Sequence, residues 1–181
     1  MPQLPELSKT AKDFHNEYAE SMLFLFHADM DYLAARCLIL NSLIEPGLEI
    51  ACQAIEKIIK ALLYLETKQK TTLKGNDKHN PAKLRNELES VQNRYKISTV
   101  HNDLLDRLFP HYQSRYHDNA DASTTKSSYE LYEIDSLYKE LRGYLSIPQE
   151  LLNRTYLSAL SPKYLSTLRH YELLKEDNHS F

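Results

Sequence analysis

The sequence predicts an all-α fold, an up-and-down bundle of helices, and two observations support this prediction. Only three glycines occur in 181 residues, and strands joined by tight turns usually need more of them. Apolar residues recur at helical spacing in several long segments, which is the pattern of helices with one buried face. A chain of this length is expected to form one domain with a sizeable core.

Two helices are predicted before the central one. The first runs from about Leu7 to Tyr18 with Ser8 as its cap, and the second from about Ala19 to Asn41. Since no helix breaker separates them, the two can form one continuous helix. The second segment has a broad apolar face that comprises Met22, Leu23, Leu25, Phe26, Met30, Leu33, Ala34, Cys37, Leu38 and Leu40.

The central helix is predicted from Glu49 to Glu66, after a Pro-Gly break at residues 46–47. Its inner face is apolar, and three alanines on it let a neighbouring helix approach closely. These inner residues are Ile50, Ala51, Ala54, Ile55, Ile58, Ile59, Ala61, Leu62 and Leu63. Glu56, Lys57 and Lys60 fall mostly on the other side, which predicts a solvated or interhelical ion-pairing face.

The helices that follow are delimited by caps and prolines. Asn80 is the predicted cap of a helix that starts at Pro81 and runs to about Tyr95. Another helix begins near residues 98–99 and carries apolar residues up to position 109. Pro110 follows, and because proline removes a helix hydrogen bond it predicts a kink or a short break there.

The remaining chain is predicted to contain a loop and further helices. Residues 118–128 are polar and predict an exposed loop, and residues 129–145 form a helix that Pro148 ends. The segment 149–175 predicts one helix and another after Ser161-Pro162. The expected organisation is therefore a helical bundle over residues 1–147 and a C-terminal helical extension, residues 148–181, packed on the same domain.

The net charge, the cysteines and the lengths of the apolar runs limit the class of protein to which this chain can belong. A net charge of −3 argues against a general polyanion-binding surface but is compatible with a local basic groove. Cys37 and Cys52 fall on apolar patterns and are expected to be buried thiols. The chain has no signal-peptide pattern and no apolar run of about 18 residues, so a cytoplasmic protein without a membrane span is expected.

No cofactor and no metal are expected. His27 and Asp31 are spaced i, i+4 on one predicted helix, a spacing compatible with metal ligation, but no second pair at matching spacing is present. The sequence also has no Gly-rich phosphate loop and no Gly-x-Ser-x-Gly nucleophile motif.

Several segments, taken in order, resemble HEPN domains, the small helical domains of bacterial toxin-antitoxin and defence systems. The resemblance covers roughly residues 19–144 and is strongest in the central helix. The similar segments are Ala28–Arg36, Glu49–Glu66, His79–Leu84 and Tyr112–Asp118, the last having His117 where the family usually has proline.

The resemblance implies a HEPN-like core with additional C-terminal helices, and it implies a homodimer. It also implies binding of RNA or nucleotide, metal-independent ribonuclease activity in a toxin-antitoxin or defence setting, and a protein partner such as a nucleotidyltransferase. The rival hypothesis is a non-catalytic helical module for protein–protein interaction, favoured by the imperfect ribonuclease motif and by tyrosines that crowd the C-terminal third.

The best-placed candidate site is Arg107, His111 and Arg115, spaced i, i+4, i+8 so that an unbroken helix would put them on one face. In the ribonuclease hypothesis Arg115 or Arg107 holds phosphate, and His111 or His117 transfers the proton. Tyr112, Tyr116 and Arg107 are the candidate binding residues. The alternative is structural: Arg115 pairs with a carboxylate and Tyr116 packs between helices.

Two other histidines, His101 and His79, lie at positions that match parts of the family pattern. Arg94 and His101 have the six-residue separation of the family's ribonuclease motif, but about one such pair is expected by chance. They also straddle a predicted helix junction. His79 matches a family position, and its simplest role is capping or packing at the start of the next helix.

Overall fold

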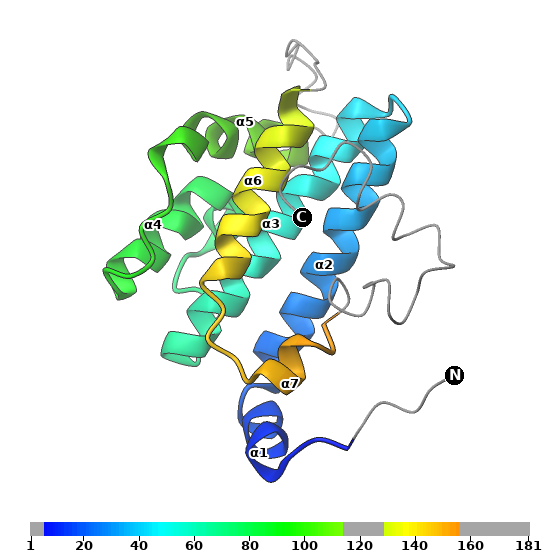
Figure 1. Cartoon of the computed structure of the whole chain (residues 1–181). Coiled ribbons are helices and arrows are strands. Elements are labelled where there is room, and N and C mark those ends of the chain that lie inside the picture. The colour runs from blue at the N-terminus through cyan, green and yellow to red at the C-terminus, as the bar shows by residue number, and fades with distance from the viewer. Residues whose placement is uncertain (1–5, 114–128, 156–181) are drawn as a thin grey trace.

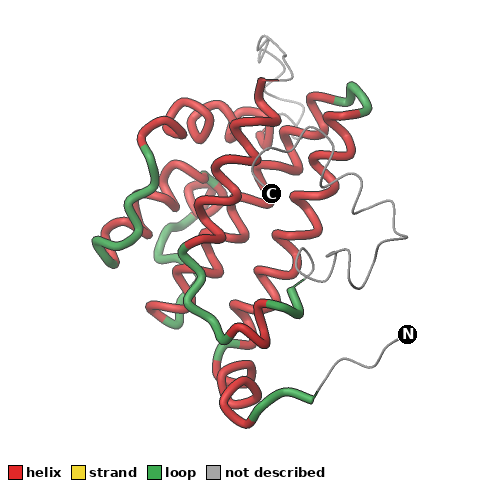
Figure 2. Tube along the Cα trace, in the orientation of Figure 1, coloured by secondary structure: helices red, strands yellow, loops and turns green. Residues whose placement is uncertain are grey.

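The structure, a computed structural model, describes residues 6–113 and 129–155. Within these ranges the chain is helical and contains no strand, so the all-α prediction is confirmed (Figures 1 and 2). The elements are α1 Lys9–Glu17, α2 Ala19–Leu40, α3 Ile44–Thr67, η1 Gly75–His79, α4 Pro81–Val91, η2 Thr99–His101, α5 Asn102–Gln113, α6 Tyr129–Gly143 and α7 Gln149–Leu152, where η marks a 3-10 helix.

Helix α3 is the centre of the bundle. It runs antiparallel to α2, has α4 and α5 on its other side, and is crossed by α6 (Figure 1). Because helices surround it, its apolar residues are fully enclosed: Ile55, Ile58, Ile59 and Leu62 have no exposed surface. Burial of four such side chains contributes on the order of 6–12 kcal/mol before conformational entropy is counted.

The first turn of α3 differs from its prediction. The expected Pro-Gly break is absent, since α3 begins at Ile44 and includes both Pro46 and Gly47. Proline is tolerated in a first turn because its missing N–H would have no helical partner there. Gly47 is needed for packing against α2: a Cβ at this position would lie 2.5 Å from Ile39 Cγ1 and 3.3 Å from Ala35 O.

Two of the predicted caps are confirmed. Ser8 caps α1 by accepting from the Ala11 N–H at 3.2 Å. Asn80 caps α4 by accepting from the Ala82 N–H at 3.0 Å and the Lys83 N–H at 3.2 Å. Both contacts satisfy backbone donors that have no partner inside the helix.

One helix end differs from its prediction, and two alternatives that the sequence left open are decided. Tyr18, with φ −116° and ψ 28°, separates α1 from α2, so the two do not form one continuous helix. Helix α4 ends at Val91 rather than near Tyr95. Pro110 lies inside α5, which continues through it to Gln113, so the chain is not broken there. The exposed Pro110 lies in the last turn, where little helix remains to be disrupted.

A buried polar network joins α2 to α6. The Tyr32 hydroxyl donates to Asp135 at 2.6 Å, and the Arg36 guanidinium pairs with the same carboxylate. Reciprocally, the Tyr138 hydroxyl donates to Asp29 at 2.8 Å, and Arg142 pairs with that carboxylate. The rings of Tyr32 and Tyr138 stack at 4.2 Å with an interplanar angle of 2°.

The two helices contribute to this network with the same residue pattern. Each carries Asp, then Tyr three residues later, then Arg four residues after that: Asp29, Tyr32, Arg36 and Asp135, Tyr138, Arg142. Since each Asp receives the Tyr and Arg of the other helix, the helices must run antiparallel with these residues opposite one another. Burial raises the pKa of Asp135, against the hydrogen bonds from Arg36 and Tyr32.

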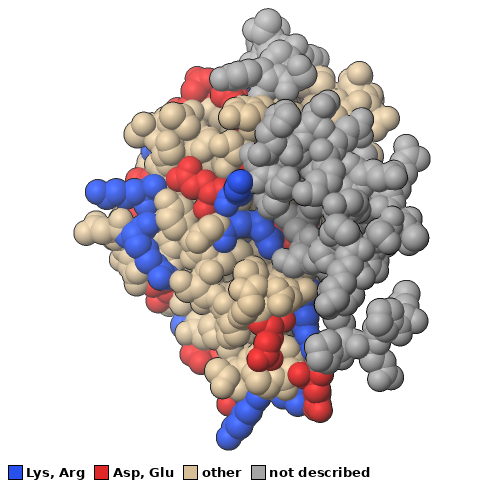
Figure 3. Space-filling view, in the orientation of Figure 1, with Lys and Arg blue, Asp and Glu red and all other residues tan. Residues whose placement is uncertain are grey.

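The start of the C-terminal segment packs on the bundle. The backbone N–H of Ser8 donates to Glu150 of α7 at 2.8 Å, which ties α7 to the beginning of α1. The further C-terminal helices predicted after residue 155 lie outside the described residues. None of the described helices is long and apolar enough to cross a membrane. On the face in Figure 3, basic and acidic side chains of the described residues are interspersed.

Candidate functional site

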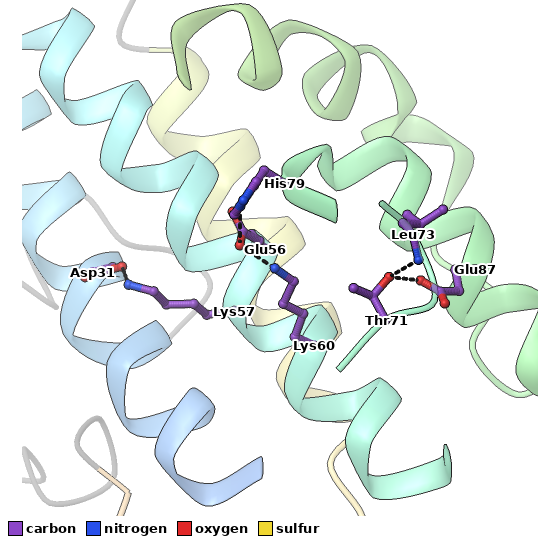
Figure 4. Close-up of polar contacts among 8 residues, drawn as sticks. All are labelled: Asp31, Glu56, Lys57, Lys60, Thr71, Leu73, His79 and Glu87. Carbon is purple, nitrogen blue, oxygen red and sulfur yellow. Dashed lines mark hydrogen bonds and ion pairs between the residues drawn. The ribbon is translucent and has the colours of Figure 1, made fainter. Parts of the chain in front are cut away.

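The candidate site is built around His79, the last residue of η1. Its Nδ1 lies 3.0 Å from Oε1 of Glu56 on α3 (Figure 4). Its side chain is 30% exposed, and among the described residues no hydrogen bond is seen at Nε2. Because Asn80 is the helix cap, His79 takes the packing role of the two that were predicted.

Glu56 is a buried carboxylate that is held by two partners. Its Oε1 accepts from Lys60 Nζ at 2.6 Å as well as contacting His79. The side chains of Glu56 and Lys60 are only 10% and 9% exposed, so the prediction of a solvated face is wrong for these two residues. Lys57 instead extends to Asp31 of α2, on the other side of α3, as expected for an interhelical ion pair (Figure 4).

An aromatic stack lies against His79. The ring of Tyr112, on α5, is 5.5 Å from the imidazole with an interplanar angle of 20°. Phe109 stacks on Tyr112 at 6.2 Å and 11°. All three rings are partly exposed, so the last turn of α5 and the end of η1 together present an aromatic surface.

The segment that leads to His79 is rich in lysine. Residues 68–83 contain five lysines and a single acidic residue, Asp77. Lys68, Lys70 and Lys83 pair with Glu17, Glu20 and Asp77. Lys74 and Lys78 are exposed and make no ion pair with the described residues. We call the surface formed by Lys74, Lys78, His79 and Tyr112 the His79 face.

Glu87 of α4 fixes the beginning of this segment. Its carboxylate accepts from the Thr71 hydroxyl (Figure 4). It also accepts from the N–H and the hydroxyl of Thr72, both at 2.6 Å. Burial acts to raise the pKa of Glu87, but the threonine hydrogen bonds and the charge of Lys60 outweigh it and hold the pKa below its usual value. The lysine-bearing segment is thereby tied to the bundle.

The predicted residues on α5 point to different partners. Arg107 pairs with Asp103 at 2.9 Å and with Glu133 of α6 at 2.7 Å. His111 is 2% exposed, and its Nδ1 lies 3.2 Å from Glu45 at the start of α3. Although burial acts to lower the pKa of Arg107, its two carboxylate partners raise it above the usual value.

The structure therefore brings one predicted site residue, Tyr112, to the His79 face. Arg107 and His111 are held by carboxylates of α6 and α3 respectively. Arg115, Tyr116 and His117 lie outside the described residues, and their predicted roles stay predictions.

Arg94 and His101 are held by separate partners. Arg94 pairs with Glu66 and donates to the Tyr95 hydroxyl at 2.5 Å. Burial raises the pKa of that tyrosine to about 12. His101 is 4% exposed, and its Nε2 lies 3.1 Å from Glu140 of α6. Arg94 and His101 therefore bind different side chains, and both contacts have a structural role.

The arrangement at His79 can orient an imidazole for proton transfer. A carboxylate at Nδ1 favours the tautomer that carries its proton there, which leaves Nε2 able to accept one. Sequence reasoning missed the contact because Glu56 and His79 are separated by 23 positions. Both were singled out individually, but nothing in the local pattern indicated that they meet.

Within the described part of the chain, no group of three or more His, Cys, Asp or Glu side chains is arranged to hold a metal ion. Asp31, considered with His27 for such a role, pairs with Lys57. Comparisons with protein-family models, curated proteins and solved structures find no match to this chain.

Proposed function

We propose that this protein binds RNA or nucleotide at the His79 face. The observation that supports this most is the stack of His79 and Tyr112, together with Lys74 and Lys78, two exposed lysines without described partners in the segment that ends at His79. Proteins bind single strands by combining lysines that attract phosphate with aromatic rings on which bases stack. The positive charge lies in one segment of the chain, so it is compatible with a net charge of −3 for the whole protein.

The HEPN resemblance supports the same proposal. It adds a toxin-antitoxin or defence setting, a homodimer, and a partner such as a nucleotidyltransferase. It also adds metal-independent cleavage of the bound RNA. The cytoplasmic location expected from the sequence is part of the same proposal. The roles suggested for Arg115 and His117 belong to this proposal.

Fluorescence anisotropy with a labelled single-stranded RNA, in chelator and at several salt concentrations, tests the binding. The Lys74→Ala, Lys78→Ala variant should bind more weakly than the parent. Its plot of log affinity against log salt should be shallower by about 1.4, because two phosphate contacts on a single strand are lost.

The matched control is Lys9→Ala, Lys139→Ala, which removes two exposed lysines of α1 and α6 that have no described partner. It carries the same change in net charge and should bind with nearly the parent's affinity and salt slope. An equal loss of RNA affinity in both variants would mean that binding depends on the overall charge of the protein and not on the His79 face.

The alternative function, a non-catalytic interaction module, is favoured by a different surface. Leu23, Phe26 and Met30 of α2 are 57%, 42% and 41% exposed. Leu23 and Phe26 line a cavity of about 510 Å³, and Leu7, Met22 and Leu151 also line it. Exposed apolar surface of this kind is typical of interaction sites, and a second copy of the chain is the occupant that the resemblance implies.

Sedimentation velocity tests whether this surface is the contact between two copies, a contact that the RNA-binding proposal also includes. If α2 forms the dimer contact, the parent sediments as a dimer and Leu23→Glu, Phe26→Glu as a monomer. Tyr132→Glu, a change at a 54% exposed position of α6, should leave the dimer intact. A parent that is monomeric at all concentrations would exclude this use of α2.

A further inference from the structure

We propose that His79 is the proton carrier in metal-free cleavage of RNA at the His79 face, and that Glu56 is its positioning residue. This inference rests on the proposed function, because it requires RNA to bind there. In this inference His79 takes the role of proton carrier that the sequence predicted for His111 or His117.

A comparison of the described histidines favours His79. His101 and His111 have carboxylate partners, Glu140 at 3.1 Å and Glu45 at 3.2 Å, but their side chains are 5% and 2% exposed. His15 and His27 are exposed but have no carboxylate partner among the described residues. His79 combines a carboxylate at 3.0 Å with a side chain that is 30% exposed. A proton carrier needs both an orienting partner and access to its substrate.

Glu56 is suited to hold the imidazole in one orientation. It projects from the fully enclosed part of α3, and Lys60, one turn further along, fixes the same oxygen that faces His79. A carboxylate so placed favours the Nδ1–H tautomer and stabilises the imidazolium that forms when Nε2 gains a proton. Glu56 acts through His79 and has no contact with RNA in this account.

The reaction is an internal transfer on RNA. His79 Nε2 accepts the proton of a ribose 2′-hydroxyl, and the 2′-oxygen forms a bond to the adjacent phosphorus. The bond from phosphorus to the 5′-oxygen breaks with its electron pair, and that oxygen takes a proton from water. The His79 imidazolium then returns its proton to the hydroxide that remains, which restores the neutral imidazole. The products are a 2′,3′-cyclic phosphate and a 5′-hydroxyl, and neither an oxidant nor a metal is consumed. Lys78, next to His79 in sequence, supplies positive charge for the phosphate.

The test measures single-turnover cleavage of a labelled RNA in chelator, with binding measured separately by anisotropy. His79→Ala should weaken RNA binding about fivefold or more, because one ring of the stack is lost. At saturating protein its single-turnover cleavage rate should still fall about 100-fold or more, the usual contribution of general acid–base catalysis. Added imidazole should restore part of the lost rate. His27→Ala, which removes an exposed histidine without a carboxylate partner, should cleave like the parent.

Glu56→Gln separates a positioning role from a structural one. The variant should lower kcat with little change in KM. In ¹⁵N spectra the His79 ring nitrogens should shift towards a mixture of tautomers, while the thermal unfolding midpoint shows whether the fold is retained. Unchanged ring-nitrogen shifts and an unchanged kcat in a folded Glu56→Gln protein would remove Glu56 from the account.

The outcomes distinguish this inference from the proposed function. Absence of RNA binding by the parent contradicts the proposed function itself. Binding without cleavage by the parent leaves that function standing and overturns the inference. Equal cleavage by the parent and by His79→Ala, or loss of cleavage in a folded His111→Ala protein alone, overturns the assignment of the proton to His79.

Discussion

At the residue scale, Gly47 shows how one missing side chain sets the distance between two helices. The backbone of α3 lies directly against α2 at this position, and the three alanines that were predicted to allow close approach, Ala51, Ala54 and Ala61, have no exposed surface. Contacts of this kind cannot relax without moving a whole helix, because the interior is close-packed.

Gly47→Ala is therefore expected to destabilise the protein. The added methyl group would lie 2.5 Å from Ile39 Cγ1 and 3.2 Å from Ile39 N, so α2 must shift. Overpacking of this kind costs about 1–3 kcal/mol, which urea unfolding can measure. Gly143→Ala is the control, because nothing lies within 4 Å of a Cβ there. An unchanged midpoint for Gly47→Ala would contradict the close approach of α2 and α3.

Two lysines of α3 have different environments, and the sequence pattern did not distinguish the buried one from the exposed one. Lys57 and Lys60 were both predicted on a polar face, yet Lys60 is buried with Glu56 while Lys57 is partly exposed. The reason is that α3 has neighbours on several sides, so a charged residue opposite the apolar stripe can still face another element. Caps were predicted correctly because Ser8 and Asn80 act on their own backbone neighbours.

At the element scale, the buried polar network joins α2 to α6, two helices that lie far apart in the sequence. Arg36→Met would leave the Asp135 carboxylate buried without its guanidinium, a change that typically costs about 3–5 kcal/mol. Arg36→Met with Asp135→Leu should cost much less than the sum of the single changes, because no unpaired charge remains. Urea unfolding of the three variants and the parent measures this coupling.

An exposed ion pair provides the comparison for that experiment. Lys12 and Glu6 pair at 2.7 Å, with side chains 49% and 88% exposed. Lys12→Ala should change the free energy of unfolding by about 1 kcal/mol or less. If Arg36→Met costs no more than Lys12→Ala, the buried network does not join α2 to α6 as described.

The tie between Glu87 and residues 71–72 predicts a pH dependence. Because the pKa of Glu87 is lower in the folded protein than its usual value of 4.5, the fold is stabilised above that pH. This stabilisation is lost as the pH falls through the lower folded-state pKa. The parent's advantage over Glu87→Gln, which keeps an acceptor oxygen but no charge, should therefore shrink as the pH falls below 4.5.

Urea unfolding of both proteins across this pH range measures the effect. Glu17→Gln, at an exposed carboxylate that pairs with Lys68, serves to show how much of any change is general to surface ion pairs. A difference between parent and Glu87→Gln that stays constant from neutral to acid pH would show that the charge of Glu87 does not stabilise the segment.

At the scale of the whole molecule, helix periodicity predicted the all-α class and the main helices but not how they meet. The start of α3 was misplaced because a proline in a first turn looks the same in sequence as a proline that breaks a helix. The repeated Asp, Tyr, Arg spacing on α2 and α6 was visible in the sequence. Its partners are about a hundred positions apart, and spacing within a helix does not identify the helix opposite.

The candidate site was predicted only in part for the same reason. Tyr112 was a candidate binding residue, and it stacks on His79; its role in binding stays a prediction. The i, i+4 relation of Arg107 and His111 suggested a shared function, but the surrounding carboxylates on α6 and α3 hold the two side chains. The site instead depends on contacts between η1, α3 and α5, which only the assembled bundle creates.

NMR chemical-shift mapping shows directly whether RNA binds this protein at the His79 face. A short single-stranded RNA would be titrated into ¹⁵N-labelled protein in chelator. We predict that the largest shifts fall on residues 74–79 and on Tyr112, and that they are lost in Lys74→Ala, Lys78→Ala. Shifts confined to α2 around Leu23 and Phe26, or no shifts at saturating RNA, would contradict the account.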